Sequence, residues 1–97
     1  MRKKNSMTEA TISCKVSLGM FSNERGVLVE LPDGRKISAI VDKRHVIVDE
    51  DPKPGAEVEG RVKVSVVEPR KDSIIVDLPQ PGLAEGPRLK VPKTFLR

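Results

Sequence analysis

Residues 57–67 read Glu-Val-Glu-Gly-Arg-Val-Lys-Val-Ser-Val-Val and form the longest alternating run in the chain. From 57 to 66 the odd positions are polar, and the even positions are valine except for Gly60. A period of two places the valines on one side of an extended chain, so this run predicts a long strand with one buried face. Gly60 in its middle predicts a bend or a close approach of another segment.

Further strands are predicted on both sides of this run. Residues 11–18 alternate between polar and apolar side chains, and four more extended segments cover residues 27–31, 35–41, 46–48 and 73–78. The sequence Pro32-Asp33-Gly34-Arg35 predicts a hairpin turn, because proline presets φ and glycine accepts a positive φ. Residues 19–26 and 49–55 are predicted to be loops, since glycine or proline interrupts the pattern there.

The fold class follows from these elements and from composition. Val, Ile and Leu supply most of the apolar side chains, and β-branched residues favour strands. We therefore predict an all-β fold, a small antiparallel barrel of five to six strands that is OB-like or, as an alternative, SH3-like. A closed barrel and an open sandwich both satisfy the pattern, although closure removes exposed sheet edges.

The 97 residues suffice for one small domain. Residues 1–7 carry three basic residues and no acid, and are predicted to be a disordered N-terminus. Residues 8–78 are predicted to be the barrel domain. Residues 79–97 contain four prolines and two glycines, which predicts an irregular basic tail. The tail is expected to pack partly on the barrel through its apolar side chains, which are Leu89, Val91, Phe95 and Leu96.

Charge is concentrated at the two ends. The chain has a formal net charge of +4, yet residues 8–78 hold eleven Lys and Arg against thirteen Asp and Glu. Each end carries three more basic than acidic residues. We expect bulk attraction to an anionic partner to lie in the ends, while the body binds through shape and local patches.

No catalytic or metal-binding apparatus is visible in the sequence. His45 is the one histidine, and Cys14 is the one cysteine and lies on the apolar side of its predicted strand. The acidic run Asp49-Glu50-Asp51 lacks the glycine and distal glutamate of a calcium loop. Phosphate-binding glycine motifs are also missing. We expect a protein that is not an enzyme and that has no cofactor and no metal.

The expected compartment is the cytoplasm, without membrane contact. A single cysteine excludes an internal disulfide and is typical of a reducing environment. No stretch approaches the ~18 apolar residues of a membrane span, and no apolar segment follows the basic N-terminus as in an export signal.

Residues 27–78 resemble a known type of barrel. The pieces that carry the resemblance are Val29-Glu30-Leu31, the 32–35 turn, residues 36–41, Pro54-Gly55, the strand 57–68 and the closing strand 73–78. In this order they are similar to the OB-fold barrels of the S1 and bacterial translation initiation factor one type. The resemblance implies an OB barrel, a fold that commonly stacks aromatic side chains on bases.

Basic residues are the candidate binding residues. On a small barrel, six of them could merge into one phosphate-contacting patch: Arg35, Lys36, Lys43, Arg44, Arg61 and Lys63. The tail adds Arg88, Lys90 and Lys93. The competing interpretation is an ordinary charged face, paired across the sheet with Glu30, Glu57 and Glu59.

Two functions are predicted from these features. The first is a non-catalytic binding module that contacts RNA, DNA or a ribonucleoprotein through a basic side patch and basic tails. Phe21 is the one aromatic residue in a predicted loop, so stacking on single-stranded bases has little support. The second is a protein–protein adaptor or accessory subunit that uses the Gly19 to Asn23 loop, the Val67 region or the C-terminal tail.

Overall fold

The computed structural model describes residues 9–79 and 88–97. Its strands are β1 (Glu9–Leu18), β2 (Glu24–Glu30), β3 (Lys36–Asp42), β4 (Val46–Ile47), β5 (Val58–Pro69), β6 (Ser73–Asp77) and β7 (Arg88–Pro92). Two 3₁₀ turns, η2 (Lys43–His45) and η3 (Lys93–Phe95), follow β3 and β7. The described residues contain no α-helix, so none could cross a membrane as a helix. The all-β prediction is confirmed.

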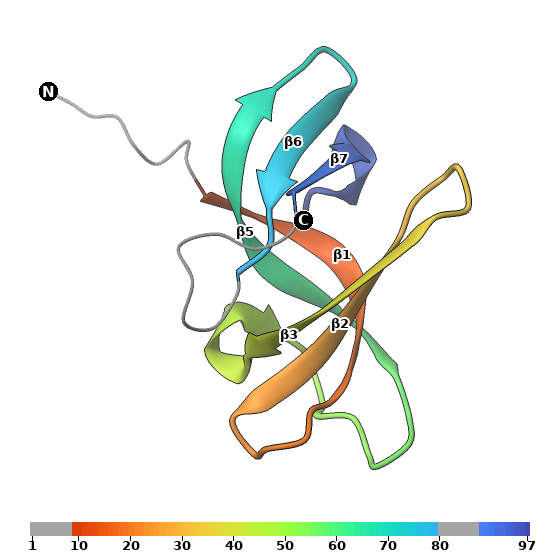
Figure 1. Ribbon diagram of the computed structural model, residues 1–97, viewed down its shortest axis with the longest axis vertical. Helices are drawn as coiled ribbons and strands as arrows, with labels where there is room; N and C mark the ends of the chain where they lie inside the picture. The colour runs from red at the N-terminus through yellow and green to blue at the C-terminus, as the bar shows by residue number, and fades with distance from the viewer. Residues whose placement is uncertain (1–8, 80–87) are drawn as a thin grey trace, which may run out of the picture.

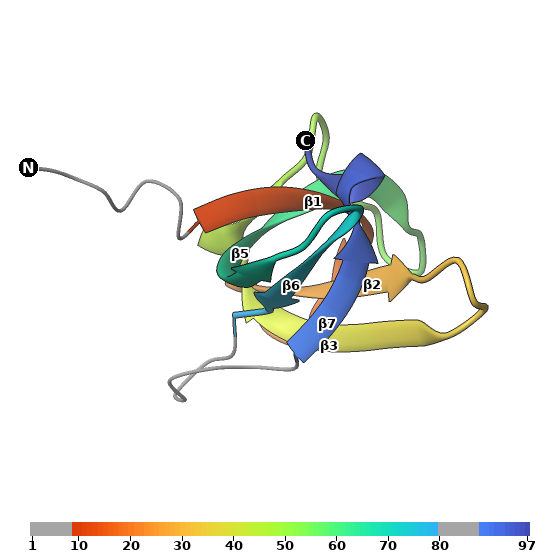
Figure 2. The same ribbon diagram turned by 90° about the horizontal axis from the view of Figure 1, so that it is seen from above.

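One antiparallel sheet curls into a small barrel. Its order is β3-β2-β1-β5-β6-β7, with β4 paired to β5 (Figure 1). Seen from above, the strands wrap around a common interior (Figure 2). β3 and β7 are the ends of this order, and no pairing joins them within the described residues. OB barrels have a five-stranded Greek-key order, whereas two three-stranded meanders lie side by side here.

The core lies on the concave side of the sheet, as the alternation predicted. Val62 and Val64 of β5 are buried, and Lys63 between them is exposed. The other buried apolar residues are Ile12, Cys14, Val16, Val27, Val29, Leu31, Val41, Ile74, Val76, Leu78, Leu89 and Val91. Each fully buried Val, Ile or Leu contributes about 1.5–3 kcal/mol from removing its surface from water.

Gly60 marks a close approach within this core, as predicted. A Cβ atom there would lie 2.7 Å from Val48 Cγ1 and 2.9 Å from the Ile47 carbonyl oxygen. The residue thus leaves room for β4 and the segment after it to lie directly against β5.

The two halves of the chain repeat one arrangement. In each half, a three-stranded meander is followed by a 3₁₀ turn and a short extended segment. Equivalent positions are 50 residues apart: 12 and 62 in the first strands, and 46 and 96 in the segments after the third strands. Val46 pairs with Val62 on β5, and Leu96 forms the equivalent bridge with Ile12 on β1. Ile12 and Val62 are themselves opposite each other. The final segment of each half therefore joins the first strand of the other half.

Hydrogen bonds at the two 3₁₀ turns support the repeat. The Lys43 N–H donates to the Asn23 carbonyl at 2.8 Å, and the Lys93 N–H donates to the Asp72 carbonyl at 3.1 Å. Sequence inspection did not detect this division. Residues 41–47 and 91–97 share only Val41/Val91 and Lys43/Lys93 as identical pairs, so the repeat is one of pattern and pairing.

The prediction that residues 79–97 lack regular structure is wrong for β7. Pro92 is the last residue of this strand, and the other three prolines precede it in the sequence. Proline is tolerated at strand ends and edges, where it removes no ladder hydrogen bond. Leu89 and Val91 are buried, so β7 completes the core. The predicted disordered N-terminus, residues 1–7, lies outside the described residues.

Candidate nucleic-acid interface

Two of the predicted basic residues lie at the β2–β3 turn and are balanced by nearby carboxylates. Asp33 accepts hydrogen bonds from the Arg35 backbone N–H at 3.0 Å and from its Nε at 2.8 Å. These hydrogen bonds lower the pKa of Asp33. The Lys36 Nζ lies 3.8 Å from Glu30, which also pairs with Lys15 at 3.2 Å. At this turn the structure agrees with the ordinary paired face, including the predicted role of Glu30.

Arg88 is also held by a carboxylate. Its Nε and Nη2 donate to the two oxygens of Asp77 at 2.8 and 3.1 Å. Asp77 is only 7% exposed, and the hydrogen bond from Arg88 lowers the pKa of Asp77. This fork-to-fork pair joins β6 to β7, so Arg88 has a structural role.

The remaining predicted residues are spread over several places. Lys43 and Arg44 lie in η2, one strand length from Lys36, or roughly 20 Å at the usual rise per residue. Lys90 is exposed on β7 opposite Ile75, and Lys93 begins η3 beside Asp72. The six residues predicted to merge therefore do not form a single patch.

Arg61 and Lys63 differ from the other predicted residues. They lie on the outer face of β5, opposite Ser13 and Thr11 of β1. Neither forms an ion pair with any residue that the structure describes. Glu59, one of their predicted partners, lies opposite Lys15 instead.

Arg97 joins this pair through the tertiary fold. Its N–H donates to the Thr11 carbonyl at 3.0 Å, and the Thr11 hydroxyl donates to the Arg97 carbonyl oxygen. Arg97 and Arg61 line one hollow of about 290 Å³ together with Ser13, Ile47, Val48, Asp49, Glu59 and Gly60. We call Arg61, Lys63 and Arg97 the cationic face.

Sequence analysis counted Arg97 only in the charge of the basic C-terminal end and did not place it in a local patch. It is 86 positions from Thr11 in the chain, and only the pairing of Leu96 with Ile12 places it there. The identical pairs Val41/Val91 and Lys43/Lys93 are the one local signal that could have indicated the C-terminal segment's place in the fold.

The chemistry of the cationic face is suited to a phosphate backbone. Guanidinium and ammonium groups lie beside the hydroxyls of Thr11 and Ser13, and all these groups are common phosphate ligands. Nearby Cys14 points inward, where burial raises its pKa to about 12, so its thiol is not nucleophilic. Within the described residues, no cluster of three His, Cys, Asp or Glu side chains could hold a metal ion.

No protein-family model, curated protein or solved structure is significantly similar to this chain.

Proposed function

We propose that this protein is a non-catalytic module that binds RNA or DNA, alone or within a ribonucleoprotein, through the cationic face. One observation carries the proposal. Arg61 and Lys63 lie two residues apart on β5, and Arg97 reaches the same face from the far end of the chain, beside two hydroxyls. None of the three forms an ion pair with the described residues, although Asp49 and Glu59 line the hollow that Arg61 and Arg97 share.

The expected contact is with phosphates and not with bases. The chain has two aromatic residues: Phe21 lies in the β1–β2 turn and Phe95 is half-buried in η3, so neither belongs to the cationic face. Base stacking therefore adds nothing at this surface. Three phosphate contacts predict a slope of about −2 to −3 for the logarithm of affinity against the logarithm of salt concentration.

The experiment compares two double charge reversals that change the net charge equally. Arg61→Glu with Lys63→Glu removes two cations of the cationic face, and Arg35→Glu with Lys36→Glu changes the β2–β3 turn. Binding to a labelled RNA and to duplex DNA is followed by fluorescence anisotropy across a salt series. We expect the first variant to lose most binding and most of the salt slope, and the second to lose much less.

Two outcomes contradict the proposal. Equal losses in both variants would mean that only net charge matters. Absence of binding by the unaltered protein at low salt would remove nucleic acid as a partner. Circular dichroism of both variants checks that the sheet is intact.

A further inference from the structure

The β1–β2 turn, residues 19–23, exposes large apolar side chains. Met20 is 86% exposed and Phe21 is 62% exposed, and Leu18 at the end of β1 is also exposed. Phe21 is one of only two aromatic residues in the chain. A cluster of exposed apolar side chains with an aromatic residue is typical of a docking site on a protein. We call Leu18, Met20 and Phe21 the apolar tip.

The turn that carries the apolar tip is held in one conformation. Within it, the Gly19 N–H donates to Glu24 and the Glu24 N–H donates to Phe21. Arg25, only 6% exposed, donates to the carbonyls of Ser22 at 3.0 Å and Glu24 at 2.7 Å. These bonds leave the backbone of the turn little conformational freedom to lose when the tip docks, which favours binding.

Acidic residues border the apolar tip. The guanidinium of Arg25 also binds Asp51 at 3.1 Å, which holds the acidic loop against the turn. Asp49 and Glu50 of this loop are exposed and form no ion pair with the described residues. An apolar tip with an acidic border is complementary to an apolar hollow with a cationic border, and it is repelled by nucleic acid or an anionic membrane.

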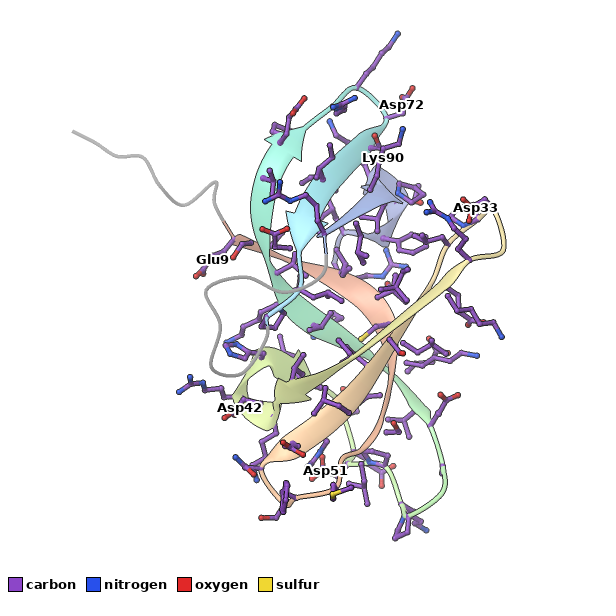
Figure 3. All side chains as sticks on the ribbon, in the orientation of Figure 1. Glu9, Asp33, Asp42, Asp51, Asp72 and Lys90 are labelled. Carbon is purple, nitrogen blue, oxygen red and sulfur yellow. The ribbon has the colours of Figure 1, made fainter. Side chains whose placement is uncertain are left out.

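A hollow with this chemistry is present at the other end of the same molecule. It measures about 260 Å³, and Leu31, Pro32, Val91 and Pro92 supply its apolar lining. A cavity of about 150 Å³ accommodates a benzene ring, so this one has room for a phenyl side chain. Figure 3 places Asp33, Asp72 and Lys90, which line this hollow, at the end of the molecule opposite Asp51.

In the part of the chain that the structure describes, unpaired lysines outnumber unpaired carboxylates around the border of the hollow. Lys90 is exposed and forms no ion pair with the described residues, while Asp33 is already bound by Arg35. Asp72 is the second carboxylate in the lining. It is exposed and unpaired, and it is adjacent to two exposed lysines outside the lining that also form no ion pair with the described residues: Lys71 in the sequence, and Lys93, whose backbone N–H donates to the Asp72 carbonyl at 3.1 Å.

We propose that the hollow of one copy receives the apolar tip of a second copy. The tip and the hollow lie at opposite ends, so one molecule cannot make this contact within itself, and copies associate head to tail. Such a heterologous contact continues into rings or open chains. Three side chains bury less than the ~1,200 Å² of a stable complex, which places the contact in the weak class.

The experiment measures the mean mass of the full-length protein against its concentration by light scattering and sedimentation velocity. Phe21→Ser alters the tip and Lys90→Glu alters the border of the hollow. Val67→Ser, which changes another exposed apolar residue, is the control. We expect the unaltered protein and Val67→Ser to gain mass with concentration, while Phe21→Ser and Lys90→Glu each stay monomeric.

Mixing the two monomeric variants provides the decisive arm. Phe21→Ser retains the hollow and Lys90→Glu retains the tip, so an equimolar mixture should form dimers and extend no further. The proposal is overturned if the unaltered protein is monomeric at every concentration. That result is expected if the apolar tip binds a different protein instead of a second copy. It is also overturned if either variant associates alone as the unaltered protein does, or if their mixture stays monomeric. Nucleic-acid binding is not involved, so either proposal can fail without the other.

Discussion

Ile12 and Val62 face each other across β1 and β5, and each is also the residue at which the last segment of the opposite half joins the sheet. Leu96 meets Ile12 on one side, and Val46 meets Val62 on the other. Both central side chains are completely buried. The two halves are therefore interlocked at this pair, and we expect them to unfold as one unit.

The first prediction is energetic coupling between these two residues. Ile12→Val should cost about 0.5–1.5 kcal/mol and Val62→Ala about 1–3 kcal/mol in unfolding free energy, through lost burial and a residual cavity. Because they are in contact, the double variant should deviate from additivity by about 0.5 kcal/mol or more. Urea unfolding measures all three values. Strict additivity of the two unfolding free-energy changes would argue against the interlocked pair. So would single-variant losses below the ~0.5 kcal/mol that is typical of an exposed site such as Lys63→Ala.

The second prediction concerns Gly60. Alanine there would place its Cβ against Val48 and the Ile47 carbonyl, both within 3 Å. Relieving that overlap must displace β4 from β5, so Gly60→Ala should destabilise the protein by about 1–3 kcal/mol although alanine suits a strand better. Thermal unfolding tests this. An unchanged or raised melting temperature would mean that β4 does not lie against β5 so closely.

A different kind of glycine is tested at the β2–β3 turn. Gly34 has a φ of 95°, and a Cβ atom added there would meet no other atom within 4 Å, so only its backbone conformation restricts substitution. Gly34→Val should cost about 1 kcal/mol or more, whereas Gly34→Asn should cost less because asparagine tolerates positive φ. Urea midpoints of the two variants give the comparison. Equal stability of both would exclude a positive φ at this position.

The fourth prediction is a pH dependence that originates at Asp77. Its hydrogen bond from Arg88 makes the folded-state pKa lower than the unfolded value of about 3.9. The stabilisation is thus complete above that value and is lost as the pH falls through the folded-state pKa. Asp77→Asn should lower the melting temperature near neutral pH, and its difference from the unaltered protein should shrink in acid.

Asp72→Asn is the matched control for that experiment, because Asp72 is exposed and forms no ion pair with the described residues. Its effect on the melting temperature should be small at every pH. A constant difference between Asp77→Asn and the unaltered protein down to acid pH would show that Asp77 is not the titrating group.

Reactivity of Cys14 provides the fifth prediction. Burial, and secondarily the charge of Glu59, raises the pKa of its thiol to about 12. In mildly alkaline buffer the thiol should remain protonated and inaccessible, and a disulfide reagent should modify it only as fast as the protein opens. Adding urea should accelerate the modification to the rate of a free thiol. Rapid labelling of the folded protein would place Cys14 outside the core.

Local patterns in the sequence were sufficient for most of β1 to β6 and for the buried faces of β1 and β5, but residues 24–26, which were predicted to lie in a loop, belong to β2. Alternation at Ile12, Cys14 and Val16 and at Val62 and Val64 depends on near neighbours alone, as does the turn at Gly34. β7 was missed because its prolines were counted over the whole segment, although Pro92 lies at the end of the strand where it is tolerated.

Pairing between distant segments was not accessible in the same way. A period of two says which side of a strand is apolar, but it does not say which strand lies beside it. The interlocked halves, the convergence of Arg97 with Arg61 and Lys63, and the opposed apolar tip and hollow all depend on such pairings. Charge shows the same distinction, because every lysine and arginine is visible in the sequence but its partners are not. Arg35 and Arg88 each lie beside a carboxylate, whereas Lys63 has no such partner among the described residues. The way the strands came together in three dimensions decided this difference.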